Sequence, residues 1–146
     1  ECRCDGRGKS GELSAGLPRA EWSVRRGGGG SSALPVRESV GTLDRLFTYA
    51  RGDVLSIEQF AAMRAEADDL IESDIGTVLE ALASQVDAAV AELRTVPVER
   101  LGNFRGVGRA QLPSTVIGCL VHGAEHAMRH VGQLSVTTRI VRSGKA

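Results

Sequence analysis

Apolar residues recur every three or four positions over most of the chain from Ser32 onward, and this spacing is typical of one face of an α-helix. In the first such segment Ser32 is a good helix-capping residue and Pro35 suits a first helical turn. The segment has regularly spaced apolar positions at Val36, Val40, Leu43, Phe47 and Ala50. The pattern predicts a helix that ends near Arg51 and Gly52.

Two further helices are predicted in the middle of the chain. Ser56 and Gln59 have the spacing of a capping box, in which two side chains satisfy the free backbone groups of a helix start. The helix that follows is expected over about 57–68. The next helix is expected over about 74–95, where Pro97 ends it because proline cannot continue a helix.

The last predicted helix is the longest. A glycine-rich connector at 102–108 precedes it, and a continuous helix without an internal proline is expected over 114–142. Its apolar residues spread over two sides and its charged residues are few, so we expect it to be mostly buried. No alternating pattern predicts a strand. The chain is therefore expected to be all-α, a four-helix bundle over residues 32–142.

The two ends of the chain differ from this pattern. Glycines interrupt residues 1–31 repeatedly, including a run of four at 27–30, which predicts a poorly structured segment. Helix one of the bundle is then degraded or disordered, with no packed helix over 1–12, and residues 143–146 form a tail. A bundle that lacks one packed helix is expected either to have low stability or to be stabilised by a partner chain, as in a homodimer.

Composition narrows the class of protein further. The chain has 146 residues, enough for one domain, with 42% hydrophobic, 25% charged and 3% aromatic residues. Equal numbers of acidic and basic residues give a formal charge of zero, which argues against nucleic acid and anionic membrane surfaces as partners. No apolar run is long enough for a transmembrane helix, and no signal peptide is visible. Three cysteines do not indicate a disulfide framework, so a cytoplasmic location is expected.

All three histidines of the chain, at positions 122, 126 and 130, lie in the last predicted helix. A spacing of four places them on one face, because each step of four residues turns the helix by only about 40°. The same stripe carries Thr115, Cys119, Gln133 and Thr137. A polar stripe on a helix with few charges is expected to face a pocket or the interior of the bundle.

Two histidines four residues apart on one helix can share a divalent metal, and His126 and His130 have this spacing. The pair is not the zinc-protease motif, because no glutamate follows His126. A competing interpretation is a set of buried histidines that bond to one another or to the backbone. A third is a polar stripe on the surface, and the spacing leaves these alternatives open.

The segment AEHAMRHVGQL at 124–134 resembles the C-terminal signature of the DinB-like (DinB/YfiT) superfamily, in which the last histidine precedes x-G-Q, as His130 does here. The segments GTLDRLFTYARGDVLSIEQ at 41–59 and VGRAQLPST at 107–115 are similar to the end of helix two and the start of helix four in that family. The resemblance covers about residues 32–142. It implies a four-helix bundle that holds a metal with a histidine of helix two and the His-x3-His pair of helix four.

Glu38 stands where one branch of that family has its helix-two histidine, six residues before Asp44. A carboxylate also binds zinc, nickel or manganese, the metals expected here. The resemblance therefore implies His126, His130 and Glu38 as the metal ligands.

The helical wheel favours a different role for Glu38. It places Glu38 on a polar stripe opposite the apolar face, in line with Thr42, Arg45 and Tyr49. On this interpretation Glu38 is solvated and paired with Arg45. His122, one turn before His126, is then the alternative third ligand.

The resemblance implies a metal-dependent enzyme of the thiol-transferase or hydrolase type. A metal-activated water or low-molecular-weight thiol would be the nucleophile, and the small-molecule substrate is not identified. Candidate catalytic residues are Gln133, which could orient a ligand, and Arg129, which could hold an anionic group. The alternative is a catalytically inactive helical binding or structural module with an incomplete metal site.

Overall fold

The computed structural model describes residues 34–66 and 75–143 of the chain. The described residues form four α-helices, a short 3-10 helix and two strands. In chain order these are α3 (Leu34–Arg51), α4 (Ile57–Glu66), α5 (Ile75–Leu93), η1 (Val98–Arg100), β1 (Phe104–Val107), β2 (Leu112–Thr115) and α6 (Val116–Arg142). The predictions for residues 1–31 and for the tail fall mostly or wholly outside the described residues.

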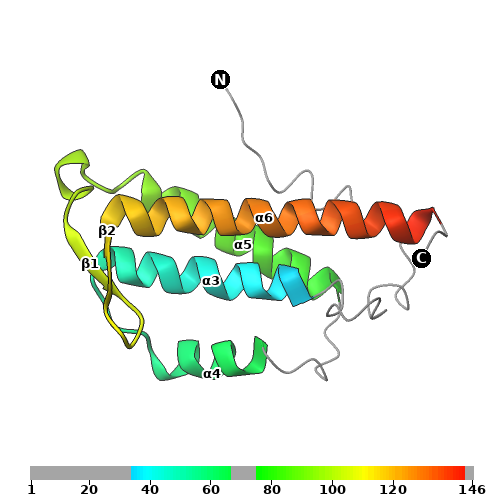
Figure 1. The fold of residues 1–146 in the computed structure, drawn as a ribbon, viewed down its shortest axis with the longest axis horizontal. Coiled ribbons are helices and arrows are strands. Elements are labelled where there is room, and N and C mark those ends of the chain that lie inside the picture. Colours follow the sequence, from blue (N-terminus) through cyan, green and yellow to red (C-terminus); the bar gives the residue numbers. More distant parts are fainter. Residues whose placement is uncertain (1–33, 67–74, 144–146) are drawn as a thin grey trace.

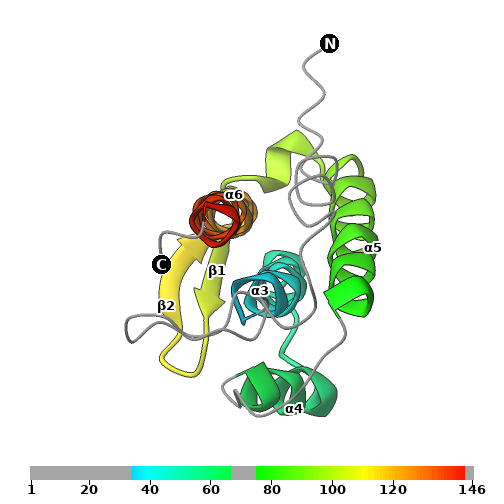
Figure 2. The same ribbon diagram turned by 90° about the vertical axis from the view of Figure 1, so that its right-hand side faces the viewer.

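Helix α3 is the centre of the described structure and packs against α4, α5 and α6. Figure 1 shows α3 and α6 side by side and antiparallel, and Figure 2 shows the other two helices around α3. The predicted all-α fold is confirmed. The four predicted helices are all present, with described bounds that differ from the expected ones by only a few residues.

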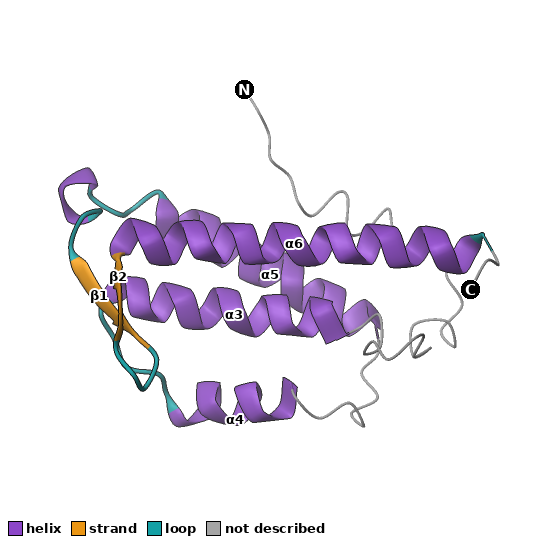
Figure 3. Cartoon of the chain, viewed as in Figure 1, coloured by secondary structure: helices purple, strands orange, loops and turns teal. Residues whose placement is uncertain are grey.

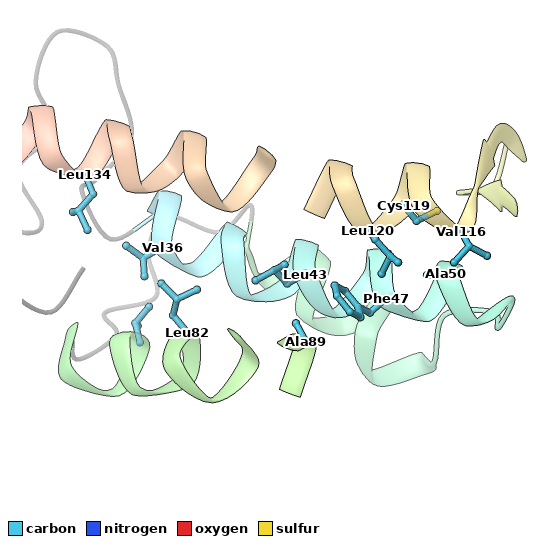
Figure 4. Packing of buried hydrophobic residues seen from close by; sticks show 11 residues of the cluster. Val36, Leu43, Phe47, Ala50, Leu82, Ala89, Val116, Cys119, Leu120 and Leu134 are labelled. Carbon is cyan, nitrogen blue, oxygen red and sulfur yellow. The ribbon is translucent and has the colours of Figure 1, made fainter. Parts of the chain in front are cut away.

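The core lies mainly along α3, between this helix and its neighbours. Phe47 and Leu43 of α3 are about 5–6% exposed, and Leu120 of α6 and Ala89 of α5 belong to the same cluster. Figure 4 shows the cluster extending from Val116 and Ala50 at one end to Val36 and Leu134 at the other. The apolar row predicted for α3 is thus the one that packs, because burial of that face stabilises an amphipathic helix.

A β-hairpin interrupts the helical architecture before α6, where only a glycine-rich connector was expected. Strand β1 pairs antiparallel with β2, in a register that runs from Phe104 opposite Thr115 to Val107 opposite Leu112 (Figure 3). Each strand has four residues, too few for an alternating pattern to stand out. Gly106 and Pro113, which face each other, are poor strand formers. The sequence pattern therefore missed these two short strands, although the fold as a whole is helical as predicted.

The hairpin is bound to the ends of both long helices. The guanidinium Nε of Arg105 donates a hydrogen bond of 2.8 Å to the carbonyl of Ala50, in the last turn of α3. The backbone nitrogen of Val116, at the start of α6, donates to the carbonyl of Asn103 at 3.0 Å. A cation at a helix C-terminus satisfies free carbonyl groups and complements the helix dipole. The hairpin therefore fixes how α3 and α6 meet at this end.

Helix α6 is continuous, as predicted, but it is buried along one face only. Ile117, Val121 and Met128 are 46%, 48% and 63% exposed. The prediction of a mostly buried helix was wrong because α3 covers only one side of α6. The low number of charged residues on the other sides does not bring a neighbour to cover them. The helix starts at Val116 because Thr115 is its cap: the Oγ1 of Thr115 accepts a hydrogen bond from the backbone nitrogen of Gly118. None of the described helices is long and apolar enough to cross a membrane.

The start of helix α4 is capped by its own residues, and its end is bound to α3. The predicted capping box is present: Gln59 N donates to Ser56 Oγ, and Ser56 N donates to the side chain of Gln59. At the other end Arg45 of α3 binds both carboxylate oxygens of Glu66, at 2.7 and 3.0 Å. The Glu66 carboxylate lies directly against Gly41, where a β-carbon would overlap it. Glycine at this position leaves room for the Glu66 carboxylate beside Arg45.

Candidate metal site

Three of the predicted site residues meet between α3 and α6. Glu38 comes from the first half of α3, whereas His126 and His130 come from consecutive turns near the middle of the antiparallel α6. Glu38 Oε1 lies 3.7 Å from His126 Nε2, and Glu38 Oε2 lies 3.5 Å from His130 Nε2. One donor atom from each residue lies within 4.8 Å of the other two. The two rings touch edge to face, with centroids 4.4 Å apart.

The ring of His130 is held in one orientation by the side chain of Gln133. The amide oxygen Oε1 of Gln133 lies 2.7 Å from Nδ1 of His130, and an oxygen can only accept, so Nδ1 carries the proton. The other nitrogen, Nε2, then presents a lone pair. This atom is buried and has no hydrogen-bond partner. Its neighbour, a carboxylate oxygen of Glu38, is also an acceptor, so the pair lacks a cation or a proton between them.

The environment of His126 favours a neutral ring. Burial lowers the pKa of His126, and the nearby His130, Arg129 and His122 lower it further, against the opposing effect of Glu38. A metal ligand must be neutral imidazole, so this shift in pKa favours metal binding near neutral pH. The Nδ1 atom of His126 is also buried without a hydrogen-bond partner. Two buried nitrogens without partners in one small cluster are unusual in a folded protein.

The lowered pKa of His126 predicts that metal-free protein loses stability in mild acid. The unfolded chain takes up a proton near pH 6.5, but the folded chain does so only at lower pH. Stability is therefore full above about pH 6.5 and falls as the pH drops from there toward the lowered pKa. Urea unfolding in chelator between pH 5 and pH 8 measures this dependence.

The control for this experiment uses the two histidines that differ in burial. His126→Gln removes the titrating group and should flatten the pH dependence between pH 5 and pH 7. His122→Gln, at an exposed position, removes only the smallest of the influences on His126 and should change the dependence much less than His126→Gln does. Unfolding midpoints that rise as the pH falls through this window would contradict the assignment.

The arginines that flank Glu38 on α3 are bound elsewhere. Arg45 pairs with Glu66, and both side chains are only 14% exposed. Arg37 donates to the backbone carbonyl of Ala65 at 2.9 Å. The alternative in which Glu38 pairs with Arg45 is therefore wrong, because α4 lies over that side of α3 and supplies Arg45 with a closer partner. Glu38, at 44% side-chain exposure, is left facing the two histidines.

The remaining predicted residues lie at the edge of the cluster. His122 is exposed, with its ring centroid 6.1 Å from that of His126, and it is not part of the three-residue group. Arg129 is also exposed. Gln133 contacts His130 rather than the open side of the site. Its spacing of three residues from His130 on a helix is the sequence signal for that contact.

The donor set fits a divalent first-row metal. Bonds of about 2.0–2.2 Å around a tetrahedral ion place two donor atoms about 3.3–3.6 Å apart, close to the separations of Glu38 from the two rings. The unpartnered Nε2 of His130 would gain a partner, and the bond from Gln133 already fixes the ring as metal sites require. Two histidines and a carboxylate are also a known ligand set for zinc.

Comparison with protein families identifies the chain. The family model of the DinB superfamily matches residues 7–134. The chain belongs to the DinB superfamily. The resemblance inferred from the HVGQ segment and its neighbours is thereby confirmed, and with it the bundle type of the fold. A search of the curated proteins finds no match to the chain.

The family match begins before the point at which the resemblance was expected to start. It begins at residue 7, ahead of the expected boundary at residue 32. The sequence pattern of the DinB superfamily thus extends into a part of the chain that lies outside the described residues. At the other end the match stops at Leu134 and so includes both His126 and His130.

Proposed function

We propose that this DinB-superfamily protein binds one divalent metal through Glu38, His126 and His130 and is a metal-dependent enzyme of the thiol-transferase or hydrolase type. The observation that carries the proposal is the lone pair of His130 Nε2, which is buried, unpartnered and directed at the Glu38 carboxylate. A cation between these groups removes the repulsion of two acceptors and binds both of them. Membership of the DinB superfamily supports the same assignment.

Each residue of the chain has a distinct part in this proposal. His126 and His130 hold the metal as neutral rings, and Gln133 positions His130 through its 2.7 Å contact with Nδ1. A bound metal would lower the pKa of a water or a low-molecular-weight thiol and so supply a nucleophile near neutral pH. Arg129, exposed and next to His130 in sequence, is the candidate for binding an anionic group of the substrate.

Metal analysis of the purified full chain tests the proposal. Protein from cultures supplemented with zinc, nickel and manganese should retain about one metal ion per chain, because three converging donors give a site of useful affinity. The double variant His126→Ala/His130→Ala should retain almost none. His122→Ala is the matched control and should keep the wild-type content, since His122 lies outside the three-residue group.

Absence of metal from the wild-type protein under these conditions would contradict the proposal. It would favour the alternative of a helical binding module without metal chemistry. Full metal content in the double variant would also contradict it, because the ion would then be bound elsewhere on the chain.

A further inference from the structure

Glu38 gives the site an oxygen donor and a negative charge. Both carboxylate oxygens face the rings, one toward each Nε2, so the carboxylate is placed to share a metal with both histidines. With two neutral imidazoles and one carboxylate, a divalent ion would leave a net charge of +1 at the site. Three neutral imidazoles would leave +2.

No described cation competes for that charge. The guanidinium of Arg45 donates to both carboxylate oxygens of Glu66, and that of Arg37 donates to the carbonyl of Ala65. Both neighbouring arginines therefore face α4. To other described residues, Glu38 makes no ion pair besides its approach to His126 and His130. Within the described part of the chain, the carboxylate is thus left facing the two histidines, and the contacts of α4 with α3 keep both arginines away from it.

Carboxylate and imidazole differ in the metals that they favour. Imidazole suits nickel, copper and zinc, whereas carboxylate oxygen suits harder ions such as manganese. Affinities for divalent ions generally rise from manganese to nickel and copper. Replacing one nitrogen donor by an anionic oxygen makes the difference between the affinities for nickel and manganese smaller. Manganese gains from the negative charge, whereas nickel loses a preferred nitrogen donor.

We infer that Glu38 sets the metal preference of the site and shifts it toward manganese relative to nickel. The inference rests on the proposed function, because it requires that the three residues bind a metal. It assigns to Glu38 a role beyond that of a third donor. With Glu38 the site binds ions that prefer oxygen ligands, such as manganese, more tightly than it would with a histidine at this position.

The experiment compares the affinities for Mn²⁺ and Ni²⁺ in metal-stripped full chain, measured by chelator competition at pH 7.5. The side chain of Glu38 is 44% exposed, so there is room for histidine at this position. Glu38→His should raise the ratio of nickel to manganese affinity by about tenfold or more. Glu38→Gln keeps the shape and removes the charge, and it should lower manganese affinity more than nickel affinity. Glu80→His, on the exposed side of α5, is the control and should leave the ratio unchanged.

The outcomes separate this inference from the proposed function. A nickel-to-manganese ratio in Glu38→His within about threefold of the wild type, with metal still bound, overturns the inference and leaves the metal site intact. Wild-type protein that binds neither ion overturns both. If Glu38→His does not fold, as judged by circular dichroism, Glu38→Gln decides: equal losses for the two ions reject the inference, and a larger loss for manganese supports it.

Discussion

Replacing His130 by alanine is expected to lower the affinity of the protein for zinc by more than about 100-fold. Loss of a residue that only orients a metal ligand typically costs about 10- to 100-fold, and His130 would supply a bond to the metal itself. Among the described residues, the group of possible ligands contains only Glu38 and His126 besides His130. Isothermal titration with zinc at pH 7.5 measures the change.

Two further variants, expected to have a smaller effect and no effect, are controls for the same titration. Gln133→Ala removes the acceptor that orients the His130 ring and should cost about tenfold. His122→Ala should leave the zinc affinity unchanged, since its ring lies beyond the cluster. Wild-type affinity in His130→Ala would reject the assignment, and a large loss in His122→Ala would make His122 a ligand.

Phe47→Ala is expected to lower the free energy of unfolding by about 3–5 kcal/mol. Phe47 is 6% exposed and lies in the core cluster along α3, so its removal leaves a cavity among residues of several helices. A loss of this size is a large part of the about 5–15 kcal/mol that stabilises a typical domain. Urea unfolding followed by circular dichroism measures the loss.

The hairpin offers a matched control for this substitution. Phe104→Ala removes the same side chain from a position that is 65% exposed, and the loss should be much smaller. Phe47→Leu, which leaves a smaller cavity, keeps the comparison measurable if Phe47→Ala does not fold. Equal losses at the two phenylalanines would show that the core is not centred on α3.

The helices were predictable because their signals are local. The apolar row of α3 and the capping box at Ser56 are read within a few turns of chain, and the structure has both. The hairpin depends instead on contacts with the rest of the fold. Arg105 finds its partner at Ala50, 55 residues away, and no local pattern specifies that bond. The one-sided burial of α6 likewise depends on which neighbour covers it.

The candidate site shows the same division. The spacing of His126 and His130 was enough to place both rings on one face of a helix. The role of Glu38 was not settled by the wheel, because a wheel shows which residues share a stripe but not which helix covers it. Since α4 and α6 both pack on α3, one polar stripe is divided between them: Arg45 faces Glu66 of α4, and Glu38 faces the histidines of α6.

Because the hairpin joins α3 and α6 near one end, a small change in the angle between the two helices becomes a larger displacement further along them. They are joined at Ala50 and Val116, and Glu38 lies 12 residues back along α3, about 18 Å from that joint at 1.5 Å per residue. Opening the angle between the helices by about 5° would move Glu38 by about 1.6 Å, whereas metal–ligand distances tolerate only about 0.2 Å. Val36 of α3 and Leu134 of α6, each 2% exposed, lie at the end of the core cluster that is away from the joint. Their packing, more than the joint, sets the precision with which the carboxylate meets the rings.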